Sequence, residues 1–282
     1  MYHVPCTIYY VVSKMYHLHA TLVLTVGSES SKNKALNCVR SKWYMVHCTL
    51  NMARGTLYLY FTYIWVVSVF AYLFLGLVIL VLPILSFQSK EILDESIDIP
   101  PKRDMYIQSI IMLSIMGVLA GLVSWKEGLD ISLVGTFSFK ILIAALLFYA
   151  LSIIVNLIQI KYADEKSEED FIMPVNRSEY GLWLLLCFTA AWSEEFTYRA
   201  VLPGLLDKAG LLPFLSIVMS ALCFSFSHYT QGWWAIPITF LFALGFQYLF
   251  KFSGSLIVPV VVHFIYNLSI EWIKRKMEKK AG

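Results

Sequence analysis

Three short groups of polar residues interrupt apolar stretches in the second half of the chain. These groups contain carboxylates, a guanidinium, imidazoles and a carboxamide: Glu194, Glu195 and Arg199, then His228, then His263 and Asn267. Such side chains can activate water, move protons and stabilise an oxyanion. Because ionisable groups at membrane depth are costly and usually face a polar cavity, each residue is a candidate for a functional site.

The first group combines two carboxylates with one cation. Glu195 and Arg199 are four residues apart, so they share a helix face and can pair. Glu194 is rotated by about 100° and can point elsewhere. Since two adjacent carboxylates in a low dielectric do not both ionise easily, Arg199 can neutralise one and leave the other as an acid or base. The alternative is an interfacial ion pair at a helix end, but two carboxylates within one apolar run favour function.

The two histidines differ in the strength of their context. His228 ends the run Phe224-Ser225-Phe226-Ser227-His228, and a lone histidine there is more often an interfacial side chain than a ligand. Phe224 lies one turn earlier and could form the wall of a pocket or simply pack. His263 and Asn267 are four residues apart on one face, which favours function over interhelical hydrogen bonding.

The three groups together form an inventory for hydrolysis. A base, two imidazoles and an amide donor suit water activation and oxyanion stabilisation, if three helices bring them to one wet pocket. The chain lacks a GxSxG elbow and an HExxH helix, so those hydrolase types are not indicated.

The composition predicts that these residues lie in a membrane. Hydrophobic residues make up 59% of the 282 positions and charged residues 15%, whereas an average soluble domain has about 25% charged residues. The mean hydropathy is +0.67. The net charge is +3, and the basic residues form short clusters rather than a patch. We therefore expect a lipid bilayer as partner and no nucleic acid.

The expected fold is all-α, a polytopic transmembrane bundle of about seven helices around a buried polar cavity. The predicted helices are Leu57–Phe87, Met105–Trp125, Phe137–Ile160, Tyr180–Leu206, Leu212–His228, Trp233–Phe250 and Ser255–Ile273. The first run has no charge in 31 residues and exceeds the roughly 20 residues needed to span. Charges and Pro174 predict an aqueous loop over Lys161–Glu179.

Four regions follow from this pattern. Residues 1–51 form an N-terminal extension, and we hypothesise that Met52 is the natural start. Residues 52–176 hold the first membrane helices, residues 177–273 the catalytic region and residues 274–282 a basic tail. With seven spans, eleven Lys and Arg residues lie on the side of the C-terminus and four on the other side, which predicts a cytoplasmic C-terminus.

The predicted helix limits place the candidate residues at different depths. Glu194 and His263 fall in the outer half of their helices and His228 at an inner end, roughly 10–15 Å away. A longer, tilted fourth helix and a fifth helix continuing past His228 would bring them level.

The order EExxxR, FxxxH and HxxxN resembles the CAAX prenyl endopeptidase and bacteriocin-processing (Abi) family of intramembrane proteases. The resemblance covers about Tyr180 to Ile273. It implies hydrolysis of a peptide bond in a membrane-associated protein or peptide. By position, Glu194 activates water, Arg199 holds Glu195, and Asn267 stabilises the oxyanion.

The resemblance leaves the cofactor open. His228 and His263 would bind either the water itself or, with Glu194, a divalent metal such as Zn²⁺, since two imidazoles and a carboxylate satisfy a catalytic zinc with one open position.

The resemblance also leaves the substrate open. Relatives act on prenylated CAAX tails in eukaryotes, and in peptide maturation or bacteriocin self-immunity in bacteria; the expected location is a bacterial plasma membrane. Two alternatives from other classes are a proton- or cation-coupled transporter and a catalytically silent scaffold.

Overall fold

The chain divides into two compact units between Val67 and Ser68. The computed structural model describes residues 19–24, 45–53, 56–64, 67–95, 100–135, 138–162, 174 and 176–281. Within them, the first unit holds a small β-sheet and the second unit is helical. The predicted boundary at residue 52 falls inside a strand of the sheet, and most of the predicted loop Lys161–Glu179 lies outside the described residues.

The first unit contains a three-stranded antiparallel sheet that the sequence analysis did not predict. Its strands are β1 (His19–Leu24), β2 (Met45–Ala53) and β3 (Thr56–Ile64), in the order β1-β3-β2. Met52 pairs with Leu57 next to the β2–β3 connection. The prediction of helix from Leu57 is therefore wrong. The run Thr56–Ile64 is rich in aromatic and β-branched residues, which favour strands.

The second unit confirms the predicted all-α membrane bundle, with seven helical rods in the described residues. The rods before residue 163 are α2 (Val69–Gly76) continued by η1 (Leu77–Val81) and α3 (Leu82–Glu95), then α4 (Lys102–Glu127) and α5 (Phe139–Tyr162). Ser68 caps the first rod, since its Oγ accepts a hydrogen bond from the Ala71 amide at 3.3 Å. The Ser68 amide in turn donates to Glu127 at 3.0 Å, which ties the start of α2 to the end of α4.

The remaining four rods carry all the candidate site residues. They are α7 (Tyr180–Glu195) continued by η2 (Phe196–Val201) and α8 (Leu202–Lys208), then α9 (Pro213–Phe226), α10 (Ala235–Ser253) and α11 (Ile257–Ala281), with the short η3 (Tyr229–Gln231) between α9 and α10. The fourth predicted helix is thus confirmed within two residues. The fifth ends two residues earlier than predicted, and the last continues through the basic tail to Ala281.

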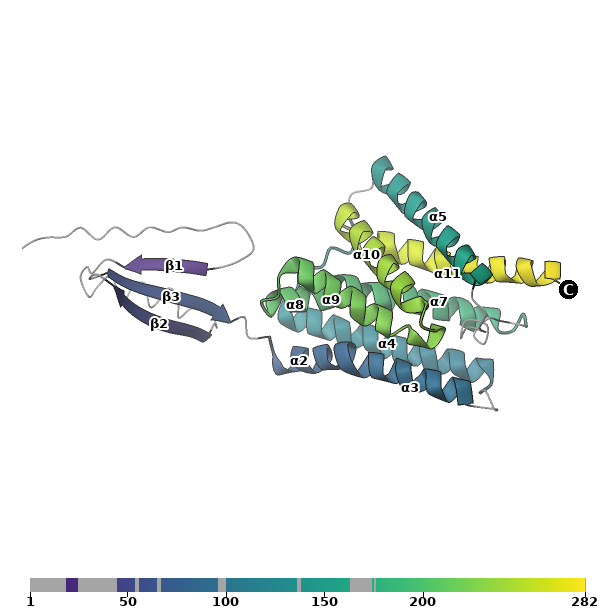
Figure 1. Cartoon of the computed structure of the whole chain (residues 1–282), viewed down its shortest axis with the longest axis horizontal. Helices are drawn as coiled ribbons and strands as arrows, with labels where there is room; N and C mark the ends of the chain where they lie inside the picture. The colour runs from purple at the N-terminus through teal and green to yellow at the C-terminus, as the bar shows by residue number, and fades with distance from the viewer. Residues whose placement is uncertain are drawn as a thin grey trace, which may run out of the picture. The chain divides into compact units, whose positions relative to one another are not determined.

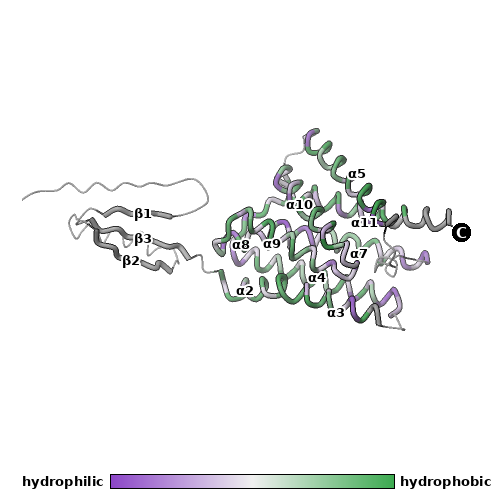
Figure 2. The backbone as a smooth tube through the Cα atoms, viewed as in Figure 1, coloured by the Kyte–Doolittle hydropathy of each residue, from purple (hydrophilic) through white to green (hydrophobic). Residues whose placement is uncertain are grey.

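In the described part of the chain, four helices are long and apolar enough to cross a membrane. They cover Val69–Ile92, Lys102–Glu127, Phe139–Gln159 and Ala235–Ser253. Figure 2 shows hydrophobic residues along most of α2, α4 and α5. Large apolar side chains on these helices are exposed, such as Leu147 at 66%, as expected for a surface that faces lipid. The chain is an integral membrane protein.

The helices before and after residue 163 pack against one another in the helical unit. Helix α4 packs on α7, α7 packs on α11, and α10 packs on α9 and α5; Figure 1 shows α2 and α3 alongside α4. A small residue permits the close approach of α4 to α7. A Cβ at Gly117 of α4 would lie 2.9 Å from the Ser193 hydroxyl of α7. Gly117 therefore lies at a close contact between these two helices.

Candidate active site

The first polar group lies where the fourth rod changes from α-helix to π-helix. Glu195 is the last residue of α7, and Arg199 lies within the π-helical turn η2. Two neighbouring helices hydrogen-bond to the backbone of this turn. The Ser220 hydroxyl donates to the Tyr198 carbonyl at 2.5 Å, and the Gln247 amide donates to the Arg199 carbonyl at 3.3 Å. Such π-helical turns are frequent at functional sites.

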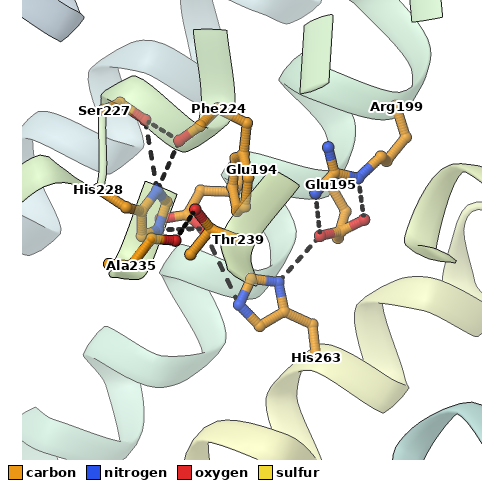
Figure 3. A network of polar contacts seen from close by, with 9 residues as sticks. All are labelled: Glu194, Glu195, Arg199, Phe224, Ser227, His228, Ala235, Thr239 and His263. Carbon is orange, nitrogen blue, oxygen red and sulfur yellow. Dashed lines mark hydrogen bonds and ion pairs between the residues drawn. The ribbon is translucent and has the colours of Figure 1, made fainter. Parts of the chain in front are cut away.

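Glu195, Arg199 and His263 form one buried network. The Arg199 Nε donates to Glu195 Oε2 at 3.0 Å, and the Arg199 Nη2 donates to Oε1 at 3.4 Å. Both side chains are almost fully buried, at 1% and 0% exposure. The other partner of Glu195 Oε1 is His263 Nδ1, at 2.9 Å (Figure 3). Because a carboxylate paired with Arg is an acceptor, His263 Nδ1 carries the proton and donates it.

Two phenylalanines enclose this network. The Phe224 ring lies 4.4 Å from the Arg199 guanidinium and 4.3 Å from the His228 ring, so it separates these two residues. The Phe246 ring of α10 stacks on His263 with centroids 5.2 Å apart. These contacts exclude water from the ion pair and restrict both imidazoles to one orientation.

His228 lies in the turn that follows α9. Its Nδ1 is 2.7 Å from the Phe224 carbonyl oxygen, and a carbonyl can only accept, so Nδ1 is the donor. Each histidine therefore uses Nδ1–H within the protein and turns Nε2 toward the cavity.

Both histidines turn Nε2 toward Glu194. The Glu194 Oε2 atom lies 3.9 Å from His228 Nε2 and 3.9 Å from His263 Nε2. Glu194 is 16% exposed, unlike the fully buried Glu195. The two adjacent carboxylates thus have separate environments, one paired and enclosed and one open to a cavity.

The predicted difference in depth between His228 and Glu194 is wrong. Helices α8 and α9 form an antiparallel hairpin, with Gly210 in the turn at φ +96°. Glu194 lies 14 residues before the end of α8 at Lys208, and His228 lies 15 residues after the start of α9 at Pro213. At 1.5 Å per residue both lie roughly 21–23 Å from the turn, so they are level. The fifth helix does not need to continue past His228.

Asn267 belongs to the same site. A cavity of about 270 Å³ is lined by Glu194, His228, His263 and Asn267, together with Gln231 and Tyr266. The structure therefore brings together all six residues that the sequence analysis selected: four line the cavity, and Glu195 and Arg199 lie behind His263.

The convergence of these groups has a consequence for protons. A carboxylate oxygen and two imidazole nitrogens with lone pairs are all acceptors. One water molecule among them supplies two protons to three acceptors. A water molecule in the cavity can therefore donate hydrogen bonds to two of these three atoms at a time.

The spacing bears on the predicted metal site of Glu194, His228 and His263. Tetrahedral zinc with bonds of roughly 2.0–2.1 Å places neighbouring ligand atoms roughly 3.4 Å apart. The separations of 3.9 Å are wider, and no group of three such side chains in the described part of the chain has the geometry of a metal site. The donor types suit zinc but their positions do not fit it, and the metal site stays a prediction.

Several residues of the site were missed by the sequence analysis. Phe246, Gln247 and Ser220 support the network, and Gln231 lines the cavity. A glutamine within the apolar helix α10 is a signal that could have been used, since polar residues inside membrane helices usually have a partner.

A comparison with protein-family models now bears on this geometry. Residues 176–269 match the model described as type II CAAX prenyl endopeptidase Rce1-like. The matched segment includes Glu194, His228, His263 and Asn267. Over this segment the chain is similar to the Rce1-like family. The match supports the recognised family and indicates a membrane peptidase of the CAAX type.

The Rce1-like segment covers about a third of the chain and excludes α2 to α5. Searches of curated proteins and of solved structures gave no match.

Proposed function

We propose that the protein is an intramembrane endopeptidase in which Glu194 activates water to hydrolyse a peptide bond of a membrane-associated protein or peptide. One observation carries the proposal: Glu194 Oε2 faces the Nε2 atoms of two imidazoles at 3.9 Å each. A water oxygen can lie at a hydrogen-bond distance of roughly 2.8 Å from both Glu194 Oε2 and one imidazole Nε2. The angle at the water oxygen between these two atoms is then near 90°. Such water is oriented before substrate arrives.

The proposed reaction begins with proton transfer from water to Glu194. The water oxygen bonds to the carbonyl carbon of the substrate, and the carbonyl oxygen becomes an oxyanion. The Asn267 amide donates a hydrogen bond to that oxyanion from the wall of the same cavity. Glu194 then gives its proton to the leaving nitrogen as the C–N bond breaks. The products are a carboxylic acid and an amine, and Glu194 returns to its starting state.

In this proposal Glu195 and Arg199 position His263. Glu195 fixes the tautomer of His263 through Nδ1, so that Nε2 keeps its lone pair for water or for a proton from it. Arg199 keeps Glu195 ionised and in place.

The proposal also includes the membrane, the orientation of the chain and the class of substrate. We propose that the protein acts in a bacterial plasma membrane with its C-terminus in the cytoplasm. Its substrate is a protein or peptide that undergoes maturation or confers bacteriocin self-immunity, and a prenylated CAAX tail is the corresponding eukaryotic substrate of the family.

The proposal predicts that Glu194→Gln abolishes peptide hydrolysis by the purified protein in lipid nanodiscs. Loss of a general base costs about 10²–10⁴-fold in rate. Glu91→Gln is the matched control, since Glu91 is an exposed carboxylate on α3 far along the chain from the site. The substrate is a membrane peptide library, and new termini are detected by mass spectrometry.

Four outcomes of this experiment are informative. Cleavage by wild type and Glu91→Gln but not by Glu194→Gln supports the proposal. A chelator that abolishes wild-type cleavage, with recovery on adding Zn²⁺, assigns a metal to the site. Equal cleavage by Glu194→Gln and wild type contradicts a base at Glu194. Proton flux in proteoliposomes without any product would instead favour the transporter.

A further inference from the structure

Helix α3 contacts the turn that carries His228. The Thr230 amide donates to the Ser86 hydroxyl at 3.2 Å. The Phe87 ring stacks on Tyr229, with centroids 4.1 Å apart and an interplanar angle of 27°. Two consecutive residues of α3 therefore contact the two residues that directly follow His228. Helix α3 lies outside the segment that matches the family.

Within the turn, the Gln231 amide donates to the His228 carbonyl at 3.0 Å and the Gly232 amide donates to the Tyr229 carbonyl at 2.8 Å. Helix α9 ends at Phe226, and His228 has φ −103° and ψ 14°, outside the helical region. The three residues after it form a short 3₁₀ turn that ends at Gly232, with φ +95°. On the α9 side, the bond from His228 Nδ1 to the Phe224 carbonyl fixes the imidazole relative to its own helix. Attachment to α3 restrains the other side of the turn.

A second cavity lies next to these contacts. It has a volume of about 490 Å³ and is lined by Glu194 and His228 on one side and by residues of α3 and α4 on the other, including Leu82, Leu85 and Met116. Glu194 and His228 thus lie between two cavities. A cavity gives the turn little packing support on this side, so the contacts with Ser86 and Phe87 are what hold the turn against α3.

We propose that Ser86 and Phe87 are positioning residues for His228. They hold the turn so that His228 Nε2 stays opposite Glu194 Oε2, 3.9 Å away. The proposal deepens the proposed function, on which its catalytic consequence rests. Ser86 is buried at 6% exposure, so its hydroxyl is available to the Thr230 amide and is shielded from lipid.

The first test measures the position of His228 without any substrate. Diethyl pyrocarbonate modifies neutral imidazoles, and mass spectrometry of the purified protein gives a rate for each histidine. In Phe87→Ala, the rate at His228 should rise about threefold or more, because loss of the stack frees the turn. The rate at His263 should not change, since α11 and Phe246 hold that residue. Ile84→Ala is the control, an exposed residue on the same helix at 53% exposure.

The second test measures catalysis on a peptide that wild type cleaves. Phe87→Ala and Ser86→Ala should lower kcat about 10-fold or more with KM within about twofold, because a small misplacement of a catalytic group is costly. Phe87→Tyr keeps a ring for the stack on Tyr229 and should restore kcat.

The outcomes separate this proposal from the proposed function. An unchanged His228 rate in Phe87→Ala overturns the positioning role, whatever the activity. Rates that rise equally at His228 and His263 also overturn it, since they indicate general loosening. If wild type cleaves nothing, the proposed function fails, while a selective rise at His228 still supports the positioning role.

Discussion

At the scale of single residues, the site depends on two neighbouring carboxylates having different surroundings. Glu195 is fully buried and paired with Arg199, whereas Glu194 is open to a cavity and faces two imidazoles. The polar residues of this site could be predicted because each interrupts an apolar stretch. The Phe246 stack on His263 could not, since nothing distinguishes it among the 19 phenylalanines of the chain.

A prediction at this scale concerns the buried ion pair. Glu195→Gln leaves the Arg199 charge buried without a counter-charge, and arginine cannot lose its proton. The variant should lose about 3–5 kcal/mol of stability. In the double variant Glu195→Gln, Arg199→Met the uncompensated charge is gone, so part of this stability should return. Thermal unfolding of both purified variants checks this. A double variant no more stable than Glu195→Gln alone would show that charge burial is not the cause.

At the scale of elements, the site is assembled by a hairpin, a π-helical turn and one close helix contact. The bounds of the fourth and fifth helices could be predicted within two residues, but the start of the first helix and the relative heights could not. The predicted heights were wrong because each helix was placed in the membrane separately. Since α8 and α9 are joined by one short turn, Glu194 and His228 lie at the same distance from that turn. The run at Leu57–Ile64 was mistaken for helix because it lacks charge. Its aromatic residues and threonine instead favour a strand.

The contact between α4 and α7 gives a prediction for a glycine. In Gly117→Ala, the new methyl group would lie 2.9 Å from the Ser193 hydroxyl, one residue before Glu194. The shift of α7 should lower kcat about 10-fold with little change in KM. Gly181→Ala is the matched control in α7, where a Cβ meets no atom within 4 Å. The prediction is checked by measuring kcat for hydrolysis of the same peptide by Gly117→Ala and Gly181→Ala. Equal kcat values for the two variants would show that the close contact at Gly117 does not determine the geometry of the site.

At the scale of the whole molecule, the candidate site residues and most of the helices long enough to span a membrane lie in different parts of the chain. The family match covers residues 176–269, yet three of the four helices long and apolar enough to span lie before it. Helices α9 and the apolar part of α11, Ile257–Ile270, are shorter than a bilayer requires. The preceding helices therefore supply much of the lipid-facing surface around the site, and α3 reaches the turn beside His228.

The most direct measurement of the central claim is proteomics of new N-termini in host membranes. Wild type, Glu194→Gln and Glu91→Gln are expressed at matched levels, with membrane insertion verified for each. The account predicts protein termini that occur with wild type and Glu91→Gln and vanish with Glu194→Gln. The same set of new N-termini in cells that express each of the three proteins would contradict hydrolysis by Glu194. That result would favour a transporter or a scaffold.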